Sequence, residues 1–193
     1  SDHGVKRMKG AFCINQWLAE KGYLRINKMP SKPGVDLKDV DVDWSKTIAW
    51  GWGGYYARVF LNVEGREAKG VIKKEDYEHY REELAEELRK IRGPNGEKWN
   101  TKVFKPEELY PEVNGDPPDL IVYFDDLYWR SAGTFGWNSM YLRKNDKGPD
   151  DAVHDWNGII VVYDPEKTIT LNKEIINITE VFSLSLKLLG LEE

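Results

Sequence analysis

The chain has a single cysteine, Cys13, and no run of apolar residues approaches the roughly 20 that a membrane-spanning helix needs. One cysteine cannot form an internal disulfide, which excludes a disulfide-stapled scaffold and favours a reducing compartment. We therefore expect a cytoplasmic protein that does not span a membrane.

An excess of positive charge is also absent. The sequence has 28 Lys and Arg residues against 33 Asp and Glu residues, which gives a net charge of −5 at pH 7. Broad nucleic-acid binding depends on neutralising phosphates with Lys and Arg, so this function class is disfavoured. Charged residues make up 32% of the chain, mostly Lys and Glu, a bias that is typical of thermophile proteins.

Aromatic side chains are abundant instead, with eight tryptophans and ten tyrosines. Residues 50–56 read Trp-Gly-Trp-Gly-Gly-Tyr-Tyr, and aromatic rings separated by glycines can form a flat stacking surface. This stretch supports an alternative function, a non-catalytic module that binds a nucleotide or a carbohydrate. Packing in the core is the default for most large aromatic residues, so both interpretations stay open.

The spacing of apolar residues predicts both helices and strands, and hence an α/β chain. The strongest helix pattern covers residues 75–92, where apolar side chains recur at steps of three and four. Two more helices and three strands rich in Val and Ile are predicted, the helices at residues 15–21 and 179–189, the strands at residues 58–63, 120–124 and 158–163. Residues 27–47 and 125–153 have the scattered Pro, Gly and Asp of long loops.

Histidine is scarce, so each of the three residues can be judged separately. His79 lies on the polar side of a predicted helix and is interpreted as a solvated surface residue. Asp2 and His3 precede Gly4, and a carboxylate beside an imidazole at a flexible position can bind a divalent cation. His154 precedes a predicted strand, at an edge where ligand-binding loops concentrate. The residues alone do not distinguish these histidines from ones without a function.

Ser1-Asp2-His3-Gly4 resembles the metal-binding signature of the alkaline phosphatase superfamily, which includes type I phosphodiesterase/nucleotide pyrophosphatases and cofactor-independent phosphoglycerate mutases. His154, followed by Gly158 and Ile159, is similar to a later histidine element of that family. Residues 42–49, 60–72 and 117–122 resemble a prokaryotic branch of the family, whose members are predicted phosphohydrolases or phosphomutases. Residues 176–191 are similar to the closing helix of the family.

The resemblance implies the carboxyl-terminal part of an alkaline-phosphatase-like fold, a sheet with flanking helices. Residues 1–26 and 116–193 would belong to this core, and residues 27–115 would form an inserted, aromatic-rich α+β subdomain. In the family, the nucleophile, a Thr or Ser hydroxyl, and the remaining metal ligands precede the signature. We therefore expect the chain to be part of a larger enzyme, to need a missing N-terminal part as its partner, and to be inactive alone.

The resemblance also implies a site for two divalent metal ions, zinc or manganese. Asp2 and His3 would bind one ion and His154 the other. Two ions about 4 Å apart can activate a nucleophile and stabilise the leaving oxygen of a phosphoester. Zinc or manganese suits imidazole and carboxylate ligands better than calcium does. The reaction would be hydrolysis of a small-molecule phosphoester, such as a phosphodiester or a nucleotide pyrophosphate, or transfer by a phosphomutase.

The substrate-binding residues are expected directly after the strand predicted at residues 120–124. There Arg130 could hold a phosphate through two hydrogen bonds, and Trp129 or Tyr128 could stack on a base or a sugar. In the alternative interpretation, Arg130 pairs with the neighbouring carboxylate at position 125 or 126 and the aromatic rings pack locally.

Two other reactive side chains are interpreted structurally. Cys13 has apolar neighbours and no nearby histidine, so we expect it to fill the core rather than act as a nucleophile. Arg66 lies between Glu64 and Glu67, and an ion pair with a flanking acid is at least as well supported as phosphate binding.

Overall fold

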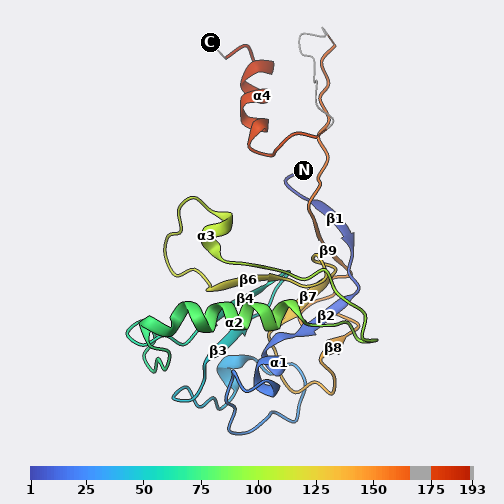
Figure 1. The fold of residues 1–193 in the computed structure, drawn as a ribbon. Coiled ribbons are helices and arrows are strands. Elements are labelled where there is room, and N and C mark those ends of the chain that lie inside the picture. Colours follow the sequence, from blue (N-terminus) through green and yellow to red (C-terminus); the bar gives the residue numbers. More distant parts are fainter. Residues whose placement is uncertain (166–174, 192–193) are drawn as a thin grey trace. The chain divides into compact units, whose positions relative to one another are not determined.

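The computed structural model describes residues 1–165 and 175–191, and the chain divides into two compact units. The first unit consists of Ser1–Gly4 with Asp155–Glu193, and the second of Val5–His154. Helices and strands are interspersed through the described residues (Figure 1), which confirms the predicted α/β class. None of the described helices combines the length and the hydrophobicity that a membrane crossing requires.

A four-stranded sheet belongs to the second unit and has the order β3-β4-β6-β5, with every neighbouring pair antiparallel. Its strands are β3 (Ala49–Trp52), β4 (Ala57–Leu61), β5 (Lys102–Phe104) and β6 (Leu120–Tyr123). The strands predicted at residues 58–63 and 120–124 are confirmed by β4 and β6. The sheet joins three strands of the predicted insertion, residues 27–115, to one strand beyond it, and the domain boundaries stay a prediction.

A second sheet places β2 (Gly10–Cys13) between β7 (Trp129–Ala132) and β8 (Tyr141–Leu142). β2 is parallel to β7 and antiparallel to β8. A two-stranded sheet joins β1 (Gly4–Arg7) to β9 (Ala152–Asp155). The stretch from position 125 to 153 thus contains strands, and the prediction of a long loop there is wrong.

α2 (Tyr77–Arg89) is the longest described helix of the second unit and follows the 3-10 helix Lys74–Asp76. It runs across the four-stranded sheet (Figure 1), with Leu84 and Leu88 fully buried. The helix predicted at residues 75–92 is therefore confirmed, because its apolar stripe is the face that the core covers.

The remaining helices are short. They are α1 (Ile14–Glu20), α3 (Pro106–Leu109), α4 (Glu180–Leu188) and the 3-10 helix Leu37–Asp39. α1 and α4 confirm the helices predicted at the two ends of the chain. α1 contributes buried residues to the core, whereas no side chain of α4 is buried.

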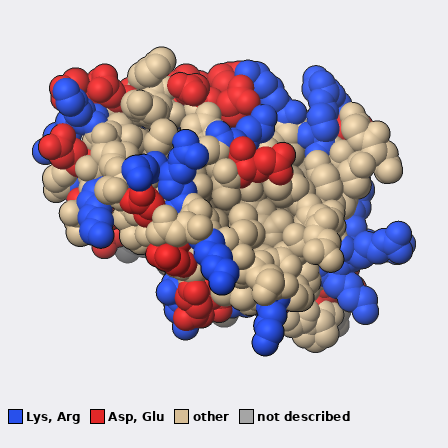
Figure 2. Space-filling model, turned by 90° about the horizontal axis from the view of Figure 1, so that it is seen from below, with Lys and Arg blue, Asp and Glu red and all other residues tan. Residues whose placement is uncertain are grey.

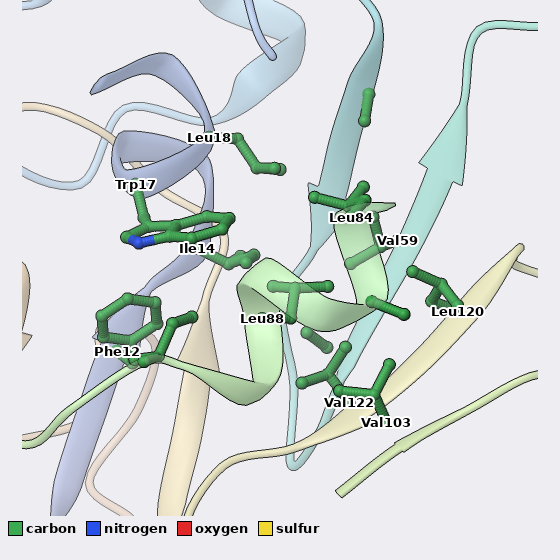
Figure 3. Packing of buried hydrophobic residues seen from close by; sticks show 14 of the residues in the cluster. Phe12, Ile14, Trp17, Leu18, Val59, Leu84, Leu88, Val103, Leu120 and Val122 are labelled. Atoms are coloured by element: carbon green, nitrogen blue, oxygen red, sulfur yellow. The ribbon is translucent and has the colours of Figure 1, made fainter. Parts of the chain in front are cut away.

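The core of the second unit forms where β2 with α1, α2 and the four-stranded sheet converge, as Figure 3 shows. Phe12 of β2, Leu88 of α2 and Val122 of β6 belong to this cluster, and each is at most 1% exposed. Burial of one such side chain contributes about 1.5–3 kcal/mol to folding. Packing in the core therefore brings together segments that are far apart in the sequence, such as those around positions 12, 88 and 122.

Cys13 lies in a smaller buried cluster beside the main core. Burial, together with the charge of Asp146, raises the pKa of its thiol to about 12. The sulfur is therefore a protonated thiol at neutral pH, which is a poor nucleophile. The prediction that Cys13 is a core residue is confirmed.

Residues 158–163 are described but form no strand, so the strand predicted there is wrong. Their apolar side chains are exposed, with Ile159 73% and Val161 85% accessible. The composition favours extended backbone, but a strand also needs a neighbouring strand as a hydrogen-bonding partner. The described residues give this segment no such neighbour, and His154 lies within β9 instead of before a strand.

Candidate functional site

The Ser-Asp-His-Gly signature lies in the first unit, bonded to a later segment of that unit. The amino group of Ser1 donates to the carbonyl oxygen of Ile159 at 2.7 Å, and the N–H of Ile159 donates to Ser1 Oγ at 2.8 Å. A Cβ on Gly4 would lie only 2.1 Å from the carbonyl oxygen of Asn157, so the close approach requires glycine. These contacts fix the backbone that carries the signature.

Asp2 and His3 form a carboxylate–imidazole pair, with 3.6 Å between Asp2 Oδ1 and His3 Nε2. His3 Nδ1 lies 2.8 Å from the carbonyl oxygen of Gly4. A carbonyl only accepts hydrogen bonds, so a neutral ring carries its proton on Nδ1 and its lone pair on Nε2. The ring nitrogen that can bind a metal therefore lies on the side of the carboxylate.

A complete set of metal ligands is not assembled among the residues that the structure describes. None of their His, Cys, Asp and Glu side chains gather in a group of three or more that could hold an ion. Zinc sites in proteins use at least three protein ligands. The pair of Asp2 and His3 therefore fits the donor chemistry of zinc or manganese, but supplies part of a site only.

His154, in β9, contacts the ring of Tyr55 edge-on, with 4.0 Å between the ring centroids and 79° between the ring planes. The guanidinium of Arg130 lies 4.2 Å from the centroid of the same Tyr55 ring. Tyr55 thus brings together two residues that the sequence singled out separately. It belongs to the aromatic stretch at residues 50–56, for which the sequence offered only a stacking surface or core packing.

Arg130 is the second residue of β7 and is 8% exposed. Its Nη1 donates to Asp150 Oδ2 at 2.5 Å, while its Nε is buried and has no hydrogen-bond partner among the described residues. The alternative prediction, an ion pair with Asp125 or Asp126, is wrong. Both of these carboxylates pair with lysines instead.

The turn between β6 and β7 explains why Arg130 is buried. Asp125, Asp126 and Leu127 have positive φ angles of 46°, 55° and 70°, a region that residues other than glycine rarely adopt. The chain reverses there within a few residues, and β7 then pairs with β2. The segment after β6 is therefore a covered strand and not an open loop.

Trp129 and Tyr128 have different environments. Trp129 is 7% exposed, and its ring centroid lies 4.9 Å from that of Trp99 inside the core. The ring of Tyr128 is half-buried, with the ammonium groups of Lys6 and Lys9 at 4.3 and 4.2 Å from its centroid. Stacking on a substrate stays a prediction for both residues, and Tyr128 is the more accessible of the two.

A cavity of about 490 Å³ opens beside Arg130 in the second unit. Its wall comes from residues 36–38, from residues 51–54 and from the segment between Arg130 and Lys147. Sequence reasoning singled out the stretch at residues 50–56 and Arg130 for unrelated reasons, and it did not connect them with each other or with residues 36–38 and 145–147. No local pattern links these segments, because only the tertiary fold brings them together.

Backbone held by Asn15 forms the floor of this cavity. The buried amide of Asn15 donates to the carbonyl oxygens of Gly51 and Gly133, both at 2.8 Å, and accepts from the N–H of Gly51 at 2.7 Å. A Cβ on Gly53 would lie 2.6 Å from the backbone nitrogen of Gly133. Glycine is therefore required at position 53, where the backbone that follows β3 approaches the backbone at the end of β7.

A second buried arginine pair lies elsewhere in the second unit. Asp119 is 3% exposed, and its carboxylate accepts hydrogen bonds from Arg66 at 2.7 and 2.8 Å, from the hydroxyl of Tyr77 at 2.5 Å and from the N–H of Leu61 at 2.6 Å. Burial, together with the bond to Asp119, raises the pKa of Tyr77 to about 12. The ion pair expected between Arg66 and Glu67 is confirmed at 3.1 Å, and Asp119 is its second partner.

Charges of both signs lie close together on the face that Figure 2 shows, beside a broad area without charged side chains. A nucleic-acid groove would instead present a continuous basic surface. This face therefore adds no support for nucleic-acid binding, and the exclusion of that function stays a prediction from net charge.

A comparison with family models gives one match, to the model described as type I phosphodiesterase / nucleotide pyrophosphatase, over residues 1–150. The matched range includes Asp2, His3, Tyr55 and Arg130, and it ends before His154. No curated protein and no solved structure matches the chain.

Proposed function

The chain belongs to the type I phosphodiesterase/nucleotide pyrophosphatase family, and on this basis we propose that it takes part in metal-dependent hydrolysis of a small-molecule phosphoester. The observation that carries the proposal is the carboxylate–imidazole pair of Asp2 and His3 within the matched residues. Transfer by a phosphomutase is the other reaction that the same chemistry allows. The mixed α/β structure is consistent with an alkaline-phosphatase-like fold.

In this proposal Asp2 and His3 hold one divalent ion and His154 holds a second. Bound ions of this type polarise phosphoryl oxygens and stabilise the leaving oxygen. Zinc or manganese is favoured because the donors are imidazole and carboxylate. We assign the role of nucleophile to no residue of this chain.

The chain's own residues orient these donors. The carbonyl oxygen of Gly4 holds the His3 ring so that Nε2 keeps its lone pair. The edge contact with Tyr55 restricts the ring of His154. Arg130, kept beside Tyr55 by its bond to Asp150, also lines a cavity, where its guanidinium can donate to a phosphoryl oxygen.

Binding of manganese or zinc to the chain tests the proposed ligands. We expect weak binding in the original protein, because its ligand set is incomplete. Asp2→Asn, His3→Gln and His154→Gln should each lower the affinity by at least about tenfold, as loss of a group that supports a metal does. Isothermal titration calorimetry with zinc and electron paramagnetic resonance of free manganese measure the affinity.

His79→Gln is the matched control, since the side chain of His79 is 78% exposed on α2 and should bind no metal. Equal affinities of the original protein and the three ligand variants would contradict the metal assignment. Sustained metal-dependent turnover of a phosphodiester by this chain, abolished in His154→Ala, would support the assignment and overturn the expectation that the chain is inactive alone.

A non-catalytic binding module is the second candidate function. The cavity lined by Trp52, which is 55% exposed, favours it, because an accessible indole can stack on a ligand. Ligand binding that persists after a chelator removes all metal, together with equal metal affinities of the original protein and its Asp2, His3 and His154 variants, would favour this candidate.

A further inference from the structure

The cavity beside Arg130 has a wall of balanced charge. Lys147 Nζ lies 2.5 Å from Asp36 Oδ1, and Arg130 Nη1 lies 2.5 Å from Asp150 Oδ2. The charged side chains that line the cavity are those of Asp36, Lys38, Arg130, Asp146 and Lys147, three basic and two acidic, and the carboxylate of Asp150, which is bonded to Arg130 but does not line the cavity, offsets the difference. The wall therefore produces no strong net field, and it does not favour a highly charged ligand over a neutral one.

The polar groups of the wall include both hydrogen-bond donors and acceptors. The carboxylates of Asp36 and Asp146 can only accept, whereas the ammonium groups of Lys38 and Lys147 can only donate. A hydroxyl group does both, so a ligand with several hydroxyls can satisfy the two kinds of group together. For a phosphate or pyrophosphate that fills the whole cavity, two of the three basic groups, Lys147 and Arg130, are already paired with carboxylates.

The aromatic and glycine residues supply a flat apolar surface. Trp52 lines the cavity with more than half of its surface exposed, and Gly51, Gly53 and Gly133 form a floor without side chains. A saturated ring with hydroxyls at its rim can lay its C–H face on an indole while its edge reaches polar groups. The volume of about 490 Å³ lies within the range of small-molecule sites.

We propose that this cavity binds a neutral polyhydroxylated ring, a sugar or a cyclitol. Its position beside Arg130 indicates that the ring is the alcohol part of the phosphoester, with the phosphate directed toward Arg130. That second step rests on the proposed function. Binding of the ring itself needs no metal.

Saturation-transfer NMR with four probes, in the presence of a chelator, tests the proposal. The probes are methyl α-D-glucopyranoside, myo-inositol, adenosine and inorganic pyrophosphate, each at millimolar concentration. We expect transfer to at least one of the first two probes and a loss of its affinity of at least about fivefold in Trp52→Ala, as for an aromatic anchor. Trp52→Phe, which keeps a ring, should restore most of the binding.

Tyr110→Ala is the control, because Tyr110 is 53% exposed and should leave binding unchanged. Binding of pyrophosphate or adenosine without either polyol would overturn the proposal, as would binding of none of the four probes or polyol binding that Trp52→Ala does not weaken. Failure of the metal titration with retained polyol binding would reject the proposed phosphoester function alone. The reverse result would reject the polyol site alone.

Discussion

Arg66 and Arg130 are both paired with a carboxylate and both lie over a tyrosine ring, yet their surroundings differ. Arg66 lies 5.9 Å from the ring centroid of Tyr77 and binds Asp119 through two nitrogens, while Tyr77 donates to the same carboxylate. Arg130 lies 4.2 Å from the ring of Tyr55 and bonds to its carboxylate partner through one nitrogen.

The two arginine–carboxylate pairs differ in burial and in the number of hydrogen bonds that each carboxylate accepts. Asp119 is buried and accepts four hydrogen bonds, and all three side-chain nitrogens of Arg66 donate hydrogen bonds, to Glu67, Asp119 and the carbonyl oxygen of Leu61. The side chain of Asp150 is 44% exposed, and Nε of Arg130 is buried with no hydrogen-bond partner among the described residues. The same residue types thus form a buried, saturated network at one place and a partly solvated pair beside a cavity at the other.

The largest expected effect separates the two carboxylates. Asp119→Asn should lower the free energy of unfolding by about 3–5 kcal/mol, because it replaces the buried acceptor of four hydrogen bonds by an amide whose NH2 group faces the donors of Arg66, Tyr77 and Leu61. Asp150→Asn should lower it by less, about 1–2 kcal/mol, because water reaches the 44% exposed side chain at this position, although the side chain of Arg130 itself is only 10% exposed. Urea unfolding measures both values, and equal losses would contradict the distinction between the two sites.

The tyrosines beside the two arginines, Tyr77 and Tyr55, should also differ in their contribution to the free energy of unfolding, by a smaller amount. Tyr77→Phe removes a hydroxyl that donates to a buried carboxylate, so it should cost about 1.5–3 kcal/mol. Tyr55→Phe keeps the ring contacts with His154 and Arg130 and should change stability by no more than about 0.5 kcal/mol. A similar loss in both variants would show that the Tyr55 hydroxyl has a structural role as well.

The smallest effect appears only at high pH. The pKa of Tyr77 is raised from 10 to about 12 in the folded protein, so the unfolded chain loses this proton first. The contribution of Tyr77 should therefore be complete below pH 10 and decline as the pH rises to about 12. The stability difference between the original protein and Tyr77→Phe should shrink over this range, because other groups such as Cys13 are common to both proteins. A constant difference would contradict the shift.

Features that arise from periodic apolar patterns or from neighbouring residues could be predicted from the sequence. The helix around Leu84 and Leu88 follows from steps of three and four between apolar residues. The burial of Cys13 follows from its apolar neighbours. Both features depend on residues within one or two turns of chain, where local propensity and the core requirement agree.

Features that depend on contacts between residues far apart in the sequence could not be predicted from it. β7 has Arg130 and Ser131 at its centre, and both are buried although they are polar, because β7 pairs with β2 and Arg130 bonds to Asp150, 20 residues further along the chain. The partner Asp119 lies 53 residues from Arg66 along the chain. Residues 158–163 have the composition of a strand, but no strand among the described residues pairs with them. Composition favours extended backbone in such a segment, but a strand forms only where the tertiary fold supplies a neighbouring strand.

Because no side chain of α4 is buried, the rate at which its amide protons exchange with solvent should differ from that of the core. A nine-residue helix is shorter than the about 12–15 residues that isolated helices need in water, so packing usually supplies the missing stability. The amide protons of α4 should therefore exchange with solvent nearly as fast as those of a short peptide. Amides near Leu84 and Leu88, fully buried in the core, should exchange only when the whole second unit opens.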